Sequence, residues 1–583
     1  MNTRPIDIDL FNYRRRATVD VNVGGVTIGC TVPVRVQSMT NTSTMDTDGS
    51  VEQVLRIVAK GGELVRLTTQ GNREAVNMGS IKEQLKVRGC NVPLVADVHF
   101  NASVADTAAR YADKVRVNPG NYVDPARTFK QLEYTDAEYA DELKRLRERF
   151  VAFLDICKAE GRAVRVGVNH GSLSDRIMSR YGDTPSGVVE SCMEFLRICR
   201  DENFDNVVVS IKTSNTTMMV TTVRRLVRVM AEEGIAYPLH LGVTEAGDAE
   251  DGRIKSAVGI GALLADGIGD TVRVSLAEAP ENEIPVAREL AGYVAGRVGH
   301  EPIDAVVAPG FNYEEPVRRL TKPVGKVGGA NVPAVVGGNV DDKDIAPDFV
   351  ASDIDVVALE SAVDGAFVAV EYSELTAENI AKIKLLKDIV LVASSQHVNA
   401  VGELRALVHK LAVEGVEAPV IIRRSYNETS VDTLRIKASA DLGVLLIDGL
   451  VDGLWLENPS SSAVELNSIM FGILQATRAR ISKTEYIACP GCGRTMYDLQ
   501  GTLARIKAAT AHLKGLKIGV MGCIVNGPGE MADADYGYVG AARGKVSLYR
   551  RKECVEKNIP EDEAIERLLQ LIESDNDMKI MRN

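Results

Sequence analysis

The chain has 583 residues, of which 45% are hydrophobic and 25% are charged, and its formal net charge is −12. This length exceeds what one hydrophobic core supports and predicts several domains, and the acidic balance argues against a general nucleic-acid-binding surface. No apolar run reaches the roughly 18 residues of a membrane span, and the first residues lack the apolar core of a signal peptide. We therefore expect a cytoplasmic, multidomain enzyme without a membrane partner.

Eight short β-branched runs alternate with helical stretches between residues 35 and 279. The first run is RVQSMT and the last is TVRVSLAEA, and intervening segments such as SVEQVLRIVAKGG carry apolar residues at helical spacing. Eight consecutive βα units predict an N-terminal (β/α)8 TIM barrel, which we assign to residues 1–290. One long helix is expected between residues 136 and 161.

A second βα-like series, with the runs VPAVVGG, DIVLVASS, APVIIRRS and DGLWLEN, follows the barrel and predicts an inserted α/β domain over residues 291–480. Residues 255–276 and 437–458 share a Lys, a Gly, a Leu-Leu pair and an Asp-Gly pair in register, so we interpret the insertion as a degenerate, barrel-like copy. The copy has Trp455 and Glu457 where the barrel has Arg273 and Ser275, which predicts a structural role. Chance similarity among small loop residues is the alternative.

The last segment, residues 481–583, changes character and predicts an α+β domain that carries metal ligands. Cys489 and Cys492 form a C-x2-C hook, and Cys523 ends an apolar strand just before the turn that holds Glu530. The hook alone suits half a zinc ribbon or a redox disulfide, but no second pair follows. Three thiolates and one carboxylate favour an iron–sulfur cluster with one exchangeable iron ligand, while a solvated loop carboxylate is the alternative for Glu530.

Five basic residues stand near the ends of predicted barrel strands, where the active sites of such barrels lie. So many cations around one rim need an anion between them, and a diphosphate suits arginines, a lysine and a hydroxyl donor. Each residue taken alone is better explained by a surface ion pair, and only the set of five favours a diphosphate. The predicted substrate-binding residues of this kind are Arg66, Arg116, Arg165, Lys212, Arg273 and Ser275.

Other polar residues are interleaved with these cations at the barrel mouth. Glu245 is the carboxylic acid expected to act as proton donor, and Asp97 and His99 share one face of their strand as catalytic candidates. A hydrogen-bonded, barrel-filling role is the alternative for Asp97 and for the histidines. Further substrate contacts are expected from Gln37, Asn118, Asn169 and His170.

The strings CPGCGRTMYDLQGT and GCIVNGPGE, with QSMTNT, RLTTQG, ADVHFN, RVNPGN, GVNHGSL and GVTEAG in this order, resemble motifs of the 4-hydroxy-3-methylbut-2-enyl diphosphate synthase family. The resemblance covers almost the whole chain, and the insertion is similar to that of the family's long three-domain form. It implies a [4Fe–4S] cluster held by Cys489, Cys492, Cys523 and Glu530. It also implies reductive ring opening and dehydroxylation of 2-C-methyl-D-erythritol 2,4-cyclodiphosphate in the non-mevalonate (MEP) isoprenoid pathway, with electrons from a ferredoxin or flavodoxin.

The main alternative function is a pterin- or corrinoid-binding barrel with a structural zinc module. For the preferred function, the electron donor is expected to dock on the last domain, because residues 483–552 contain eleven Lys or Arg and five Asp or Glu. A homodimer is expected, since in two-domain relatives the cluster domain closes over the partner's barrel. Closure within one chain, with the insertion as a spacer, is the other arrangement.

Overall fold

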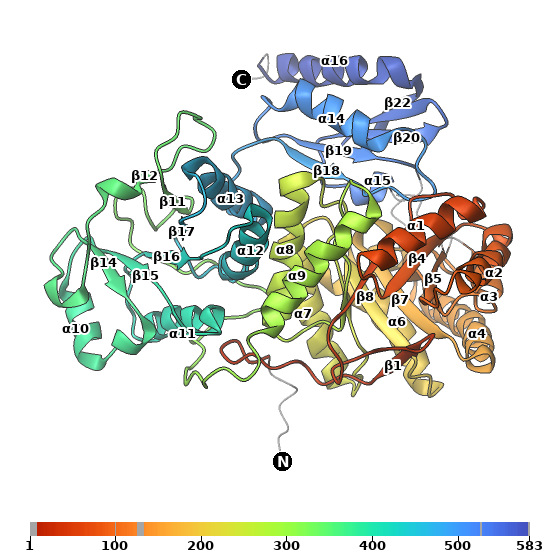
Figure 1. Cartoon of the computed structure of the whole chain (residues 1–583), viewed down its shortest axis with the longest axis horizontal. Coiled ribbons are helices and arrows are strands. Elements are labelled where there is room, and N and C mark those ends of the chain that lie inside the picture. Colours follow the sequence, from red (N-terminus) through yellow and green to blue (C-terminus); the bar gives the residue numbers. More distant parts are fainter. Residues whose placement is uncertain (1–7, 99–100, 125–132, 525–526, 581–583) are drawn as a thin grey trace.

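The computed structural model describes residues 8–98, 101–124, 133–524 and 527–580. The chain forms a barrel, a second α/β unit beside it and a C-terminal domain that lies over the barrel (Figure 1). Among the described residues, no helix combines the length and the apolar character needed to cross a membrane.

Eight parallel strands form one sheet in the order β8-β7-β6-β5-β4-β3-β10-β9. A bridge between Val209 of β8 and Leu239, just before β9, connects the two ends of this sheet and closes the barrel. This confirms the predicted (β/α)8 architecture, with each β-branched run buried in a strand. The strands are β3 (Arg35–Met39), β4 (Leu64–Thr69), β5 (Leu94–Val98), β6 (Lys114–Val117), β7 (Ala163–Asn169), β8 (Val207–Lys212), β9 (His240–Leu241) and β10 (Thr271–Val272).

Helices surround the barrel strands, and a hairpin packs under their amino ends. The predicted long helix is α4, which starts at a capping box between Thr135 and Glu138 and ends at Gly161 in the left-handed conformation. The hairpin is β1 (Val21–Val23) and β2 (Val26–Ile28), and its valines pack against the start of β4. The helices are α1 (Thr47–Ala59), α2 (Asn72–Val87), α3 (Ala102–Ala108), α4 (Asp136–Glu160), α5 (Asp175–Tyr181), α6 (Pro185–Asp201), α7 (Thr216–Glu232), α8 (Ala249–Ala265) and α9 (Glu283–Ala295).

The inserted unit is a parallel sheet in the order β12-β11-β17-β16-β15-β14-β13 with helices beside it. The four predicted runs are strands β11, β15, β16 and β17; β14 and the short edge strands β12 and β13 were not predicted. Helix α9 runs across the predicted boundary at residue 290. The elements are β11 (Ala334–Gly337), β12 (Phe349–Val350), β13 (Val356–Val357), β14 (Phe367–Val370), α10 (Ala377–Leu385), β15 (Val390–Ala393), α11 (Ala400–Val413), β16 (Val420–Ser425), α12 (Val431–Ile447), β17 (Gly453–Glu457) and α13 (Ala463–Ala476).

Helices α8 and α12, which carry the repeated sequence segments, pack directly against each other. A β-carbon on Gly261 of α8 would lie 2.8 Å from Cβ of Ala440, and one on Gly443 of α12 would lie 2.8 Å from a methyl of Val258. The contact is reciprocal: Gly261 faces Ala440, three positions before Gly443, and Gly443 faces Val258, three positions before Gly261. This reciprocal contact is what two copies of one segment make around a local two-fold axis.

A buried ion network lies at the same junction and has the same reciprocity. Arg224 of α7 contacts Asp266, which caps α8, and Asp448, which caps α12, each at 2.8 Å. Arg405 of α11 contacts the same two carboxylates at 2.8 Å and 2.7 Å. The four side chains are at most 1% exposed, and one continuous hydrophobic core extends from the barrel into the inserted unit around them.

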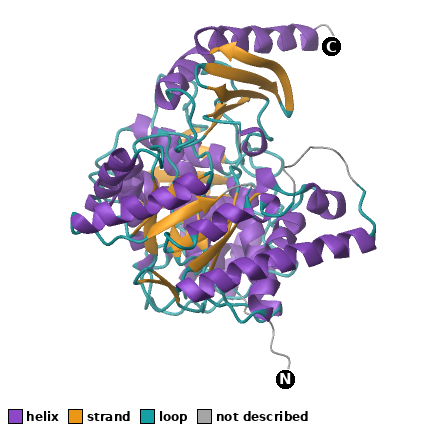
Figure 2. Cartoon of the chain, turned by 90° about the vertical axis from the view of Figure 1, so that its right-hand side faces the viewer, coloured by secondary structure: helices purple, strands orange, loops and turns teal. Residues whose placement is uncertain are grey.

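The C-terminal domain has a mixed five-stranded sheet in the order β18-β19-β20-β21-β22, with α14 and α16 packed on it (Figure 2). It has its own core, and a bridge between Ala246 and Ala488 joins it to the barrel mouth of the same chain. Strand β22 and helix α16 were not predicted. The elements are β18 (Glu485–Ala488), α14 (Leu499–Thr510), β19 (Lys517–Met521), α15 (Gly527–Glu530), β20 (Tyr536–Ala542), β21 (Lys545–Arg550), β22 (Glu553–Pro560) and α16 (Glu561–Ile580).

Candidate functional site

A cavity of about 100 Å³ lies between the barrel mouth and the C-terminal domain. It is several times larger than the space that one water molecule requires. Its walls come from the carboxyl ends of the barrel strands on one side and from three segments of the C-terminal domain on the other. The lining includes Arg66, Asp97, Arg116, Arg165, Asn169, Lys212, Thr244, Glu245, Arg273, Ser275, Cys489, Cys492, Arg494, Cys523 and Glu530.

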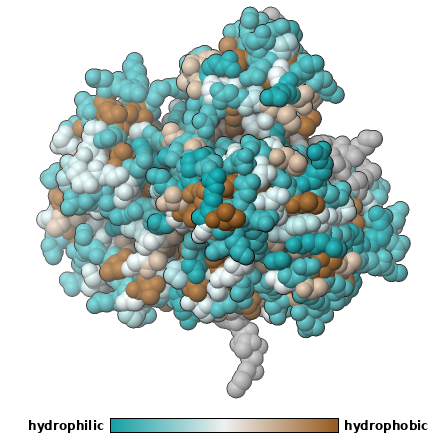
Figure 3. Space-filling view, turned by 45° about the vertical axis from the view of Figure 1, so that its right-hand side comes forward, coloured by the Kyte–Doolittle hydropathy of each residue, from teal (hydrophilic) through white to brown (hydrophobic). Residues whose placement is uncertain are grey.

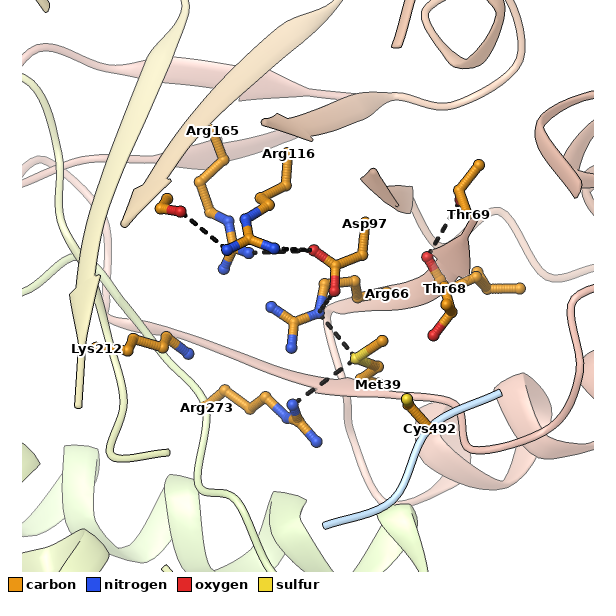
Figure 4. A network of polar contacts seen from close by, with 12 residues as sticks. Met39, Arg66, Thr68, Thr69, Asp97, Arg116, Arg165, Lys212, Arg273 and Cys492 are labelled. Atoms are coloured by element: carbon orange, nitrogen blue, oxygen red, sulfur yellow. Dashed lines mark hydrogen bonds and ion pairs between the residues drawn. The ribbon is translucent and has the colours of Figure 1, made fainter. Parts of the chain in front are cut away.

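Three arginines of the barrel converge on Asp97 (Figure 4). Arg116 donates to its carboxylate at 3.0 Å, and Arg66 and Arg165 lie 3.8 Å and 3.7 Å from it. Burial lowers the pKa of Arg66 to about 10, although Asp97 works in the opposite direction. One carboxylate cannot neutralise three guanidinium groups, so this side of the cavity keeps an excess of positive charge.

The remaining predicted cations complete the ring. Arg273 makes two hydrogen bonds to Glu283, at 3.0 Å and 2.9 Å, which fix its orientation. Lys212 enters the cavity from β8 and lies between Arg165 and Arg273 in Figure 4. Ser275 follows Arg273 on the same rim. The structure thus brings together all five predicted cations and the serine, while their contacts with a ligand stay a prediction.

The three predicted cysteine ligands line the same cavity from the C-terminal domain. The Cys489 sulfur accepts the backbone N–H of Gly522 at 3.2 Å, and the Cys492 sulfur accepts Nε–H of Arg494 at 3.4 Å. Burial raises the pKa of Cys489 to about 12. Burial acts the same way on Cys492, but the Arg494 guanidinium outweighs it and lowers the pKa of that thiol.

Three thiols and one carboxylate are a donor set that suits an iron–sulfur cluster, in which each ligand binds a different iron. Among the described residues, no three His, Cys, Asp or Glu side chains lie close enough together to hold one metal ion. Nη1 of Arg494 is buried without a hydrogen-bond partner in the described structure and is available to an anionic group.

Glu530 reaches from the C-terminal domain into the barrel mouth. Its carboxylate accepts hydrogen bonds from Asn169 at 2.7 Å and from Thr244 at 3.1 Å. Glu245 lies against the Glu530 carboxylate. The backbone of Glu245 has a φ of +49°, a strained conformation for a non-glycine residue. Burial raises the pKa of both carboxyl groups, and for Glu530 the neighbouring Glu245 raises it further. A buried pair of carboxyl groups is more stable with one proton shared between them than with both groups ionised.

Two glycines allow the domains to approach this closely. Helix α15, which carries Glu530, packs on the single turn His170–Ser172 at the end of β7. A β-carbon on Gly171 would lie 2.2 Å from the carbonyl carbon of Gly529, and one on Gly529 would lie 1.9 Å from the Gly171 oxygen. Any side chain at either position would therefore push Glu530 out of the mouth.

Several predicted site residues lie outside the cavity wall. Gln37 donates to Thr271 inside the barrel at 2.7 Å, Asn118 donates to Ser172 at 2.9 Å, and His170 pairs with Asp183 at 2.6 Å. His99 falls outside the described residues. Asn169, in contrast, lies on the wall and joins the two domains.

Two polar residues of the cavity wall, Thr244 and Arg494, were not predicted, and neither were Lys114 and His240, which are buried in the barrel. Arg494 follows the C-x2-C hook within the quoted string CPGCGRT, and its place in that string was the available signal. Thr244 directly precedes Glu245. Lys114 and His240 stand in strands that read as apolar, and only their neighbours in space reveal them.

Comparisons with known proteins identify the family. A model described as the GcpE TIM-barrel domain matches residues 18–288, and one described as the GcpE protein C-terminal domain matches residues 485–574. The curated protein "4-hydroxy-3-methylbut-2-en-1-yl diphosphate synthase (flavodoxin)" of Phocaeicola vulgatus is 57% identical over 98% of this chain and 99% of its own length. The proteins of the same name from Bacteroides fragilis and Chlorobaculum tepidum are 58% and 39% identical, and they match 98% and 97% of this chain and 97% and 89% of their own lengths.

Proposed function

The chain belongs to the GcpE family, and on that premise we propose that it converts 2-C-methyl-D-erythritol 2,4-cyclodiphosphate into 4-hydroxy-3-methylbut-2-enyl diphosphate in the MEP pathway. The observation that carries the proposal is the shared cavity. A ring of cations suited to a diphosphate and a set of thiols suited to a redox cluster face each other across it. A reductase for an anionic substrate needs both groups within reach of one bound molecule.

We assign the cofactor as a [4Fe–4S] cluster held by Cys489, Cys492, Cys523 and Glu530. Such a cluster supplies electrons one at a time and an iron that can act as a Lewis acid. The Arg494 guanidinium favours the thiolate form of Cys492, and the Gly522 N–H would stabilise a Cys489 thiolate against the opposing effect of burial.

The two glutamates divide the acid chemistry between them. Burial raises the pKa of both carboxyl groups, and that of Glu530 is raised further by Glu245, so Glu530 must give up its proton to bind iron as a carboxylate and Glu245 would be its acceptor. Glu245 then stands at the cavity wall as a general acid that lets the substrate oxygen leave as water. Asn169 and Thr244 hold the Glu530 carboxylate in place by hydrogen bonds.

In this proposal the barrel arginines, Lys212 and Ser275 hold the diphosphate. Asp97 orients three arginines, so its contribution to catalysis is positional, and Gln37, Asn118 and His170 support the rim behind the wall. A catalytic part for His99 stays a prediction, as do the homodimer and the cytoplasmic location. Closure of the site does not need a second copy, because the C-terminal domain lies over its own barrel.

The test is anaerobic purification followed by iron, sulfide and turnover assays. About four irons and four sulfides per chain, with reduction of the cyclic diphosphate by reduced flavodoxin, would support the proposal. One zinc, no sulfide and no turnover would overturn it in favour of a binding barrel with a structural metal module.

The electron donor is proposed to dock beside the cysteine loop of the C-terminal domain. Of the eleven basic residues counted in residues 483–552, seven pair with carboxylates and Arg494 is buried in the cavity. Three stay exposed and outside ion pairs in the described part of the chain: Arg543, Lys545 and Arg551. The sequence count therefore overstated the basic surface and its extent.

Two of these three follow the strand that packs against the Cys523 loop. Arg543 and Lys545 form the turn between β20 and β21, and Gly540 of β20 packs against the carbonyl of Gly522, which precedes Cys523. Exposed Met496 and Ile524 flank the same loop, and hydrophobic side chains do reach the surface of this domain near the barrel (Figure 3). A small apolar patch with a basic rim suits an acidic redox protein such as a flavodoxin.

The Arg543→Glu/Lys545→Glu double variant tests this placement. It should raise the KM for reduced flavodoxin about tenfold or more while turnover with a small chemical reductant is unchanged. Lys326→Glu, on an exposed loop of the inserted unit, is the matched control. Equal KM values in the double variant and the control would move the docking site elsewhere.

A further inference from the structure

His240 lies between two basic side chains inside the barrel. Its Nδ1 is 3.0 Å from Nη1 of Arg165, and its Nε2 is 3.3 Å from Nζ of Lys212. All three side chains are at most 5% exposed, so their contacts with one another are shielded from bulk solvent. Among the described residues, no carboxylate lies within ion-pair distance of the Lys212 nitrogen.

The chemistry of the three groups allows one consistent arrangement of protons. Arg165 is always a donor, so Nδ1 of His240 must accept its proton. A neutral imidazole that accepts at Nδ1 carries its own proton at Nε2 and donates there. The group facing Nε2–H must then be an acceptor, and Lys212 accepts only as a neutral amine. A charged Lys212 would place two N–H donors head to head in a buried site.

We infer that Lys212 is a neutral amine in the empty site and takes up a proton when an anionic ligand enters. His240 acts as the positioning residue, because its Nε2–H satisfies the amine lone pair until the ligand arrives. The proton comes from solvent, and the ammonium that forms then faces the ligand's oxygen atoms. The inference rests on the proposed function only for the identity of that ligand.

The surrounding charges act in the same direction. Burial and the nearby arginines lower the pKa of Lys212 well below its usual value, and burial with Lys212 and Arg165 does the same for His240. Glu245 is the carboxyl group that Lys212 acts on electrostatically, and it is shared with Glu530, while Asp97 is shared by three arginines. The charged groups that act on Lys212 from the other strands are Arg66, Arg116, Arg165 and Arg273, Lys114 acts on His240, and Glu245 is the titratable carboxyl group on the same cavity wall.

A neutral Lys212 has a consequence for binding. Between the pKa of the free site and that of the occupied site, one proton is bound with each ligand, so affinity falls about tenfold for each unit of rising pH. With Lys212 neutral, the empty barrel has one positive charge fewer among its arginines, which reduces their mutual repulsion. Lys212 becomes charged when the ligand binds, and the negative charge of the ligand then neutralises it.

The experiment is isothermal titration of the oxidised holoenzyme with the cyclic diphosphate, without reductant, in two buffers of different ionisation heat near neutral pH. Wild type should take up about one proton more than Lys212→Arg, which keeps a charge at all times. Protonation changes of the ligand are common to both proteins and cancel in this difference. No difference between them would overturn the inference.

Two further measurements separate the possible failures. Inorganic pyrophosphate replaces the cyclic substrate in a parallel titration, so a protein that binds pyrophosphate with the expected proton difference but ignores the cyclic substrate refutes only the proposed function. His240→Phe removes the donor that satisfies the amine and should reduce the proton uptake by a measurable fraction. Unchanged uptake in that variant would remove His240 from the assignment.

Discussion

Replacing Arg224 by methionine should destabilise the junction between the barrel and the inserted unit far more than a surface change does. Arg224 makes 2.8 Å contacts to Asp266 and Asp448, and its Nη1 also donates to the Tyr313 carbonyl at 2.9 Å. Its removal leaves two buried aspartates with Arg405 alone, which is one uncompensated negative charge. Breaking a buried pair in this way costs about 3–5 kcal/mol.

A double-mutant cycle with Asp448→Asn isolates the contact between the domains. The single variants each leave one net buried charge, whereas the double variant is neutral again, so the two costs should fall short of additivity by about 2 kcal/mol. Trp455, the single tryptophan, lies buried in the inserted unit, and its fluorescence during urea unfolding reports on this region. Lys322→Met, at an exposed ion pair, should change the stability far less than Arg224→Met does. Additive costs within about 0.5 kcal/mol would refute the buried network as described.

Three further predictions concern the site and the core. Arg165→Met should raise the KM for the cyclic diphosphate about tenfold to 100-fold and leave the cluster spectrum unchanged, because phosphate contacts and cluster ligands lie on different domains; an unchanged KM would contradict this. Glu530→Ala should keep a coloured protein but lose most turnover, and Glu530→Cys should abolish the change in the electron paramagnetic resonance signal that substrate induces; normal turnover in Glu530→Ala would show that the fourth ligand is misassigned. Burial lowers the pKa of His409 to about 4, so below about pH 6.5 the unfolded chain binds a proton that the native chain does not. Stability should therefore fall by up to about 3 kcal/mol between about pH 6.5 and pH 4, and His409→Gln should lose less over the same range.

The barrel could be predicted because its strands are short β-branched runs separated by amphipathic helices, and that pattern has few other solutions. The edges were harder to predict. Strand β22, with the sequence ECVEKNIP, is mostly polar and is recognised only by its pairing with β21. Helix α16 was missed as well, although its apolar residues Leu568 and Ile572 pack into the core of the C-terminal domain.

For the site, residue type and strand position were enough to predict the cationic ring and the cysteines, but not their partners. Asp97 looked like an acid catalyst, yet three arginines surround it. His240 stands in a run that reads as a buried strand, and its importance depends on two cations from other strands. The basic excess of the last domain was a correct count, but residues such as Lys507 pair with carboxylates of the barrel. Long-range pairing of this kind leaves no local pattern in a sequence.

The different ways in which the three units meet have a mechanical consequence. The barrel and the inserted unit share one hydrophobic core and the interlocked glycines of α8 and α12, so separating them would expose apolar surface. The C-terminal domain has a core of its own, to which the barrel contributes Ala277, and it also meets the barrel through polar contacts such as Lys255 to Glu485 at 2.7 Å. Water can replace polar contacts at low cost, but not apolar packing. The barrel and the inserted unit should therefore move as one rigid body, and the C-terminal domain should tilt relative to them about the connection at residues 477–484. The rate at which substrate enters the cavity should depend on this tilting motion.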